Sequence, residues 1–96
     1  MTISTSQNTI TLNGNIKSVS DYQSIKSTID SLAQQHKSIT IDLLDSISIT
    51  SSVIGYFNKL VLKDKIDLHI NVGSEQLMEL FDDLNLTSLF KVKRNA

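Results

Sequence analysis

The spacing of hydrophobic residues changes repeatedly along this chain, and the change limits the folds open to it. In residues 9–12 and 38–44, apolar side chains alternate with polar ones, which is typical of a half-buried β-strand. In residues 18–36 the apolar positions instead recur at intervals of three and four, which places them on one face of a helix. A chain that alternates strands and helices in this way is expected to fold as an α/β domain.

The same pattern assigns the rest of the chain. One or two strands and a turn are predicted before residue 16, a second helix over 51–63, a strand over 66–70 and a third helix over 74–84. The final residues predict a helical turn followed by a short strand or a tail. Ser20 and Gln23 predict a capping box at the start of the first helix, and Ser74 predicts the N-cap of the third.

The predicted element order is β, β, α, β, α, β, α in a single domain over residues 1–96, because a chain this short holds one core. The alternating second half favours parallel strands joined by right-handed crossovers, and the first two strands, with no helix between them, are expected to be antiparallel or staggered. We therefore expect a mixed sheet of four or five strands with helices mainly on one face. Thr40 and Asp42 are predicted to point to the less covered face.

Composition excludes several classes of function. The net charge of −1 and the pI near 6.0 give no basic surface for nucleic acid or an anionic membrane. The absence of cysteine excludes disulfides, thiolate metal sites and cysteine nucleophiles. No apolar run approaches the ~18 residues of a membrane span, and no signal segment opens the sequence. We expect a soluble, cytoplasmic protein without direct membrane insertion.

The sequence offers no constellation for catalysis. The two histidines, His36 and His69, are too far apart to form a motif, and the glycines are isolated rather than grouped in a phosphate-binding loop. No serine stands in a recognisable motif with a histidine that would act as its base. We therefore expect a non-enzymatic protein with no catalytic residue, no metal and no cofactor.

Two adjacent serines, Ser51 and Ser52, follow Thr50 where a strand-like run gives way to the second helix. Any of the three hydroxyls can act as the N-cap by accepting a hydrogen bond from the helix behind it, an interaction worth about 1 kcal/mol. A hydroxyl at this position is also suited to phosphorylation, because a helix N-terminus favours negative charge. The local pattern leaves both interpretations open.

The stretches "SITIDLL", "SISITSSVIGYFNKL" and "LMELFDDLNLTSLFKVKR", with "LNGNI" near the start, together resemble the STAS domain of bacterial anti-sigma factor antagonists over essentially the whole chain. Ser51 matches the family's phosphoacceptor serine, Ser52 the serine after it, and Gly55 the second glycine of the motif. Thr50 replaces the family's aspartate, and Val53 replaces its first glycine. These two departures bear on regulation rather than on the fold.

The resemblance implies a switch protein that binds its partner when dephosphorylated and releases it when phosphorylated. It implies Ser51 as the phosphorylation site, with Ser52 and Thr50 as alternatives. The implied partners are a GHKL-type serine kinase that doubles as the anti-sigma factor, and a PP2C-type phosphatase. The predicted partner-binding residues are Ser51, Ser52, Val53, Gly55, Tyr56 and Lys59. The face through Ser52, Gly55, Tyr56, Lys59 and Lys63 is expected to look outward.

A second interpretation is open. The chain also resembles the STAS subunit of bacterial lipid-transport ABC complexes, in which a hydroxyl residue at the same helix start docks constitutively on the ATPase. A STAS domain that binds a small ligand or nucleotide is less favoured, because the sequence has no phosphate-binding loop.

Overall fold

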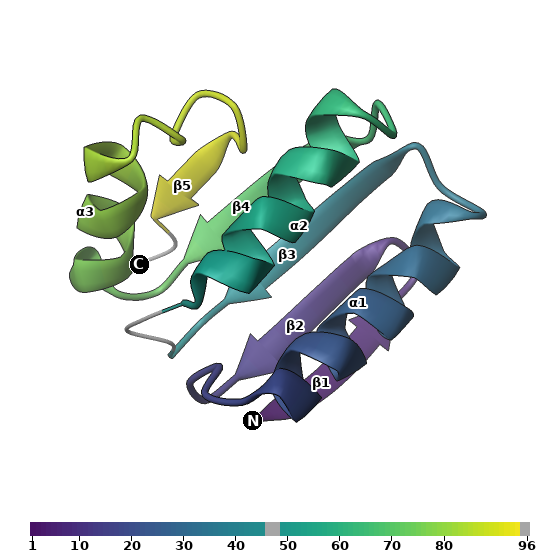
Figure 1. The fold of residues 1–96 in the computed structure, drawn as a ribbon, viewed down its shortest axis with the longest axis horizontal. Coiled ribbons are helices and arrows are strands. Elements are labelled where there is room, and N and C mark those ends of the chain that lie inside the picture. Colours follow the sequence, from purple (N-terminus) through teal and green to yellow (C-terminus); the bar gives the residue numbers. More distant parts are fainter. Residues whose placement is uncertain (46–48, 95–96) are drawn as a thin grey trace.

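In the computed structural model, which describes residues 1–45 and 49–94, the strands form one mixed sheet (Figure 1). The strands follow one another across the sheet in chain order: β1 (Thr2–Ser6), β2 (Thr9–Asn13), β3 (Ser38–Leu43), β4 (Asp67–Val72) and β5 (Val92–Arg94). The helices are α1 (Val19–Ala33), α2 (Ser51–Leu62) and α3 (Glu75–Asp83). β1 is antiparallel to β2, and the remaining neighbours are parallel. The predicted α/β class and strand directions are confirmed.

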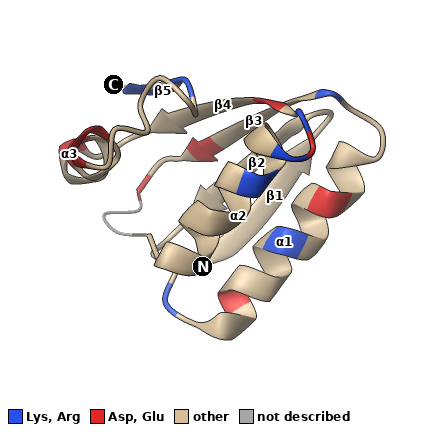
Figure 2. Ribbon diagram, turned by 45° about the horizontal axis from the view of Figure 1, so that its top comes forward, with Lys and Arg blue, Asp and Glu red and all other residues tan. Residues whose placement is uncertain are grey.

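The register of the sheet separates an apolar face from a polar one. Ile41 pairs with Ile10 and Ile70, and all three side chains are buried. In the next row Asp42 pairs with Thr11 and Asn71, and these side chains are half-buried. Because successive residues of a strand point to opposite faces, the first row lies under the helices and the second on the open side. Figures 1 and 2 show the helices gathered on one face, as predicted.

Three phenylalanines join the helices in the centre of the core. The rings of Phe57 and Phe90 and those of Phe90 and Phe81 meet edge to face, with centroids 5.9 Å apart in both pairs. All three side chains are fully buried. Phe57 belongs to α2, Phe81 to α3, and Phe90 to the segment before β5, so this cluster holds α3 beside α2 on the same face of the sheet.

The predicted cap of the first helix is wrong by two residues. Ser18, not Ser20, is the N-cap of α1: its Oγ accepts a hydrogen bond from the Asp21 N–H at 3.1 Å, and the Asp21 carboxylate accepts one from the Lys17 N–H at 3.0 Å. Ser18 already has extended backbone angles, so the helix begins at Val19 and the box uses Asp21 in place of Gln23. Ser74 caps α3 as predicted.

Two close contacts hold together the segments that follow β2, β3 and β4, at the end of the sheet from which the chain continues to α2. A Cβ on Gly73 would lie 1.8 Å from the carbonyl oxygen of Leu44, so only glycine allows the chain after β4 to pass this close to the end of β3. The Asp45 carboxylate accepts a 2.6 Å hydrogen bond from the Gly14 N–H. Residues 46–48, part of the connection quoted above, lie outside the described residues. In the described part of the chain, no helix combines the length and apolarity needed to cross a membrane.

Candidate functional site

At the start of α2, the hydroxyl residues Thr50, Ser51 and Ser52 occupy different positions. Thr50 has extended backbone angles and is the N-cap: its Oγ1 accepts a hydrogen bond from the Val53 N–H at 3.4 Å, and its carbonyl accepts one from the Ile54 N–H at 3.1 Å. Ser51 and Ser52 are the first two residues of the helix, and both are exposed. Because Thr50 caps the helix, the capping interpretation does not account for the two serines.

Two of the predicted partner-binding residues are buried. Val53 is 0 % exposed and belongs to the core, so it offers no surface to a partner. Tyr56 was expected on the outward face and is only 4 % exposed. The reason is that α1 lies beside this flank of α2, and the ring of Tyr22 meets the Tyr56 ring edge to face with centroids 6.4 Å apart. The outward position predicted for Tyr56 is therefore wrong, and burial leaves neither side chain available as a surface contact.

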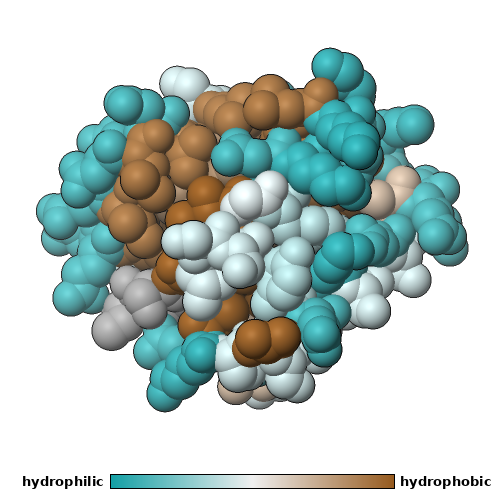
Figure 3. All heavy atoms as spheres, viewed as in Figure 1, coloured by the Kyte–Doolittle hydropathy of each residue, from teal (hydrophilic) through white to brown (hydrophobic). Residues whose placement is uncertain are grey.

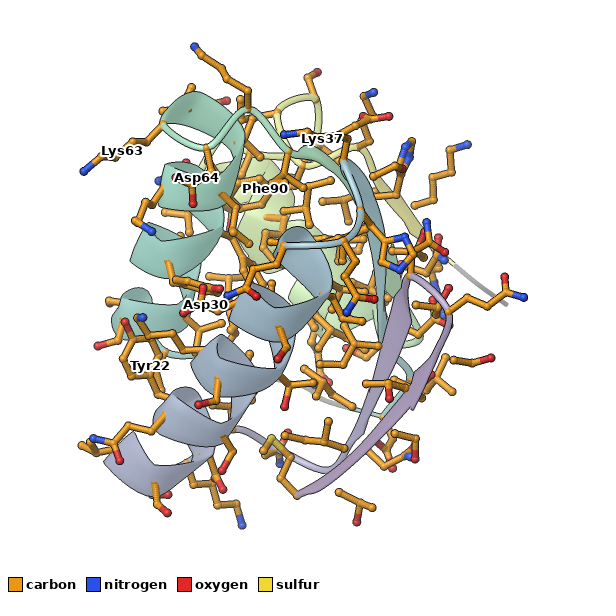
Figure 4. All side chains as sticks on the ribbon, turned by 90° about the vertical axis from the view of Figure 1, so that its right-hand side faces the viewer. Tyr22, Asp30, Lys37, Lys63, Asp64 and Phe90 are labelled. Atoms are coloured by element: carbon orange, nitrogen blue, oxygen red, sulfur yellow. The ribbon has the colours of Figure 1, made fainter. Side chains whose placement is uncertain are left out.

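The Tyr56 hydroxyl joins α2 to α1 through a carboxylate. It donates a 2.5 Å hydrogen bond to Asp30, whose other oxygen accepts a 2.9 Å hydrogen bond from Lys26. Burial, followed by the bond to Asp30, raises the pKa of the tyrosine hydroxyl. Partial burial acts to raise the pKa of the Asp30 carboxyl, but the hydrogen bonds from Tyr56 and Lys26 outweigh it and lower that pKa. Figure 4 shows Tyr22 and Asp30 extending from α1 towards α2.

The remaining predicted docking residues of α2 are exposed. Gly55 lies in open space, since a Cβ built on it would have no neighbour within 4 Å. The Lys59 ammonium lies 3.2 Å from the Asp64 carboxylate and 5.9 Å from the centre of the Tyr56 ring. Lys63 points into solvent in Figure 4. The outward face predicted for α2 is therefore correct for Ser52, Gly55 and the two lysines.

A hollow of about 300 Å³ separates the beginnings of α1 and α2. Its lining residues are Lys17, Ser18, Val19, Tyr22, Thr50 and Ser52. Ser18 and Thr50 are the N-caps of the two helices, so two positively polarised helix ends and one lysine surround the same space. Sequence reasoning located the start of each helix but not their convergence, because residues 17–22 and 50–52 meet only when the sheet has formed.

A largely half-buried apolar strip lies along the other flank of α2. Ser51, Ile54 and Val61 follow helical spacing and share this flank, with Ile54 and Val61 half-buried. Figure 3 shows apolar side chains gathered between α2 and α3. The name apolar strip is used for the apolar side chains of α2, α3 and the segment after α3 that are not fully buried, namely the exposed Leu62 and Leu84 and the half-buried Ile54, Val61, Met78, Leu80, Leu86 and Leu89. Met78 and Leu80 lie on different flanks of α3, so only part of this set faces α2. Helical spacing places Leu84 on the same apolar stripe as Leu77 and Phe81, yet Leu84 is 47 % exposed; Leu62 is 59 % exposed.

Within the described residues, His, Asp and Glu side chains form no group of three or more that could hold a metal ion. On the sheet, the Asp42 carboxylate is hydrogen-bonded to Asn71, and the Asp67 carboxylate is hydrogen-bonded to His69 and Lys91. Comparison of the chain with protein-family models, curated proteins and solved structures finds no match. The interpretation of the site therefore depends on its own geometry and on the motif.

Proposed function

We propose that this protein is a non-enzymatic switch in which phosphorylation of Ser51 controls binding of a partner protein. The observation that carries the proposal is the exposed Ser51 hydroxyl on the first residue of α2, at a helix end that Thr50 already caps. Phosphorylation of this hydroxyl adds about −1.5 to −2 charges at pH 7. The modification therefore changes the charge of a surface without removing a hydrogen bond that holds the fold.

The surroundings of Ser51 favour a bound dianion. The first turn of α2 contains no acidic residue, and the helix end contributes partial positive charge. The hollow with Lys17 lies next to this site, and its lining includes Thr50 and Ser52 but not Ser51. Negative charge at a helix N-terminus stabilises the helix by about 0.3–1 kcal/mol. The phosphorylated domain is therefore expected to keep its fold.

The docking surface in this proposal consists of Ser51, Ser52, Gly55, Lys59 and the apolar strip between α2 and α3. A partner that covers the strip removes the Ser51 hydroxyl from water. A neutral hydroxyl loses little in that step, whereas a phosphate dianion is costly to desolvate and repels acidic groups of the partner. The unmodified protein therefore binds and the phosphorylated protein dissociates.

The resemblance to STAS-domain anti-sigma factor antagonists supplies the class of partner. The partner is a GHKL-type kinase that acts as an anti-sigma factor in the bacterial cytoplasm, and a PP2C-type phosphatase reverses the modification. The two departures from the family motif are compatible with this assignment. Thr50 supplies a capping oxygen at the position of the family's aspartate, although without the charge. The Val53 side chain lies in the core and leaves the docking surface clear.

The experiment uses the full chain, its cognate kinase and ATP, followed by mapping of the phosphate by mass spectrometry. We expect one phosphate on Ser51, its loss in the Ser51→Ala variant, and its retention in Ser52→Ala, the matched control one residue along the helix. Modification that persists in Ser51→Ala moves the acceptor to Ser52 or Thr50. The absence of phosphate from all three residues contradicts the switch.

A constitutive docking subunit of an ABC transporter is the second candidate. The exposed Leu62 and Leu84 of the apolar strip favour it, since a permanent interface buries such side chains and needs no modification to form. Co-purification separates the two functions, with a GHKL kinase expected for the switch and an ABC ATPase for the docking subunit. Ser51→Asp and Ser51→Ala give a second criterion: opposite effects on binding favour the switch, and similar losses favour plain docking.

A further inference from the structure

The two edges of the sheet differ in how well they are protected against pairing with another strand. β5 has three residues, carries Lys93 and Arg94, and follows Lys91. β1 has five residues with the sequence TISTS, without a charge or a proline. Figure 2 shows β1 in tan throughout and β5 ending in blue. Short length, charge and proline are the features that keep natural edges from pairing, and β1 has none of them.

The hydrogen-bonding groups that β1 presents outward follow from its register. Within the described residues β1 pairs with β2 alone, and Ser6 pairs with Thr9 across a two-residue turn. Residues joined by such a turn form a hydrogen-bonded pair, and the pattern alternates along an antiparallel ladder. The N–H and C=O groups of Thr2, Ser4 and Ser6 therefore point to β2. Those of Ile3 and Thr5 point away from the sheet.

We propose that β1 pairs in antiparallel fashion with β1 of a second copy of this chain, about a two-fold axis at Ser4. In this register the N–H and C=O groups of Ile3 form two hydrogen bonds with those of Thr5 of the second copy. By symmetry, Thr5 forms the same two hydrogen bonds with Ile3 of the second copy. All five residues of each strand take part, and the two sheets become one. An antiparallel strand is self-complementary about a two-fold axis, which is why the surface fits a copy of itself.

The charges around β1 favour this occupant. No charged side chain of β1 meets its own copy across the axis, so the isologous contact brings no like charges together. α1 covers β1 in Figure 1, and the flank of α1 turned away from α2 carries Ser24, Thr28 and Ser31, with one acid, Asp21, in the first turn. The Asp21 carboxylate accepts a hydrogen bond from the Lys17 N–H. The charged pair Lys26 and Asp30 lies on the other flank, towards Tyr56.

The pairing adds apolar contact on the helix side of the sheet and leaves the start of α2 accessible. Ile3 packs against the core and is half-buried, so Thr5 of the second copy covers part of its remaining surface. α2 and α3 lie over the opposite part of the sheet from β1 (Figure 1). Five residues per strand bury much less than the roughly 1,600 Å² of a standard interface. The dissociation constant of the dimer is therefore expected to be micromolar or higher.

Sedimentation velocity and amide hydrogen exchange, both measured on the full chain from micromolar to millimolar concentration, test the proposal. We expect the mean mass to rise from monomer to dimer. The Ile3 and Thr5 amides are expected to become protected over the same range, whereas the Ser4 amide, which bonds to β2, stays protected throughout. Monomer mass at millimolar concentration overturns the proposal, as does protection of Ile3 and Thr5 that is independent of concentration.

Two variants identify the surface that associates. Thr5→Pro removes an outward N–H from each copy and is expected to raise the dimer dissociation constant tenfold or more. Ser4→Lys places two ammonium groups together at the axis on the open face and is expected to have the same effect without altering the strand backbone. Thr11→Lys, on the same face of β2, is the matched control and should leave association unchanged. Dimerisation that survives both β1 variants overturns the assignment to β1.

Discussion

The contact between α1 and α2 gives the sharpest test of the packing, and the perturbation is Tyr56→Phe. The change removes the hydroxyl that donates to Asp30 at 2.5 Å and keeps the buried ring. A hydrogen bond to a charged group contributes about 1.5–3 kcal/mol, but Asp30 is 40 % exposed and keeps Lys26, so we expect a loss of about 1–1.5 kcal/mol in the free energy of unfolding. Urea denaturation at pH 7 measures this loss, with Tyr22→Phe as the matched control.

The pH dependence of the loss follows from the pKa of Asp30. The folded-state pKa of this carboxyl lies below the ordinary value of 3.8, so its contribution to stability is present above pH 4 and disappears as the pH falls through the lowered value. The difference between wild type and Tyr56→Phe should therefore shrink in acid. In alkali, wild type should lose stability above pH 10, because the pKa of the Tyr56 hydroxyl is raised in the folded state, and Tyr56→Phe should lose less. A Tyr56→Phe loss no larger than that of Tyr22→Phe refutes the reasoning.

Three further predictions concern the start of α2 and the glycines. Thr50→Ala is expected to lower the free energy of unfolding by about 1 kcal/mol through loss of the cap, while Ser51→Ala changes it by less than about 0.5 kcal/mol; equal losses in urea denaturation contradict the assigned cap. Gly55→Ala is expected to stabilise the free protein by about 0.5–1 kcal/mol, because the added methyl group meets open space, and a lower melting temperature by calorimetry argues against this. Gly73→Ala is expected to destabilise by about 1–3 kcal/mol, since its Cβ collides with the Leu44 carbonyl, and an unchanged denaturation midpoint rejects the contact.

The elements that local spacing determines could be predicted from the sequence. Ile39, Ile41 and Leu43 alternate with polar residues, and all three are buried on one face of β3. Helical spacing likewise puts Phe57 and Leu60 on one side of α2, and both side chains are fully buried. In these cases the same residues determine both the element and the face that it buries, so no distant contact is needed.

The features that were missed depend on contacts between distant residues. Tyr56 stands at the rim of the apolar stripe of α2, and only the packing of α1 against that rim buries it beside Asp30. The Asp30 carboxylate gave no signal in the sequence, because an acid at position 30 also fits a solvated helix face. The exposure of Leu84 was missed for the opposite reason, since helical spacing alone does not show whether an apolar side chain is covered. Phosphorylation of Ser51 stays a prediction.

The central claim is that a phosphate on Ser51 is accommodated at the start of α2 without a change of fold. The most direct measurement compares proton–nitrogen correlation spectra of the unmodified protein and of protein carrying phosphoserine installed at position 51 during translation. We predict shifted amide signals confined to the first turn of α2 and to the facing start of α1, with the rest of the spectrum unchanged. Shifts spread through the sheet and α3, or a collapsed spectrum, would contradict the claim.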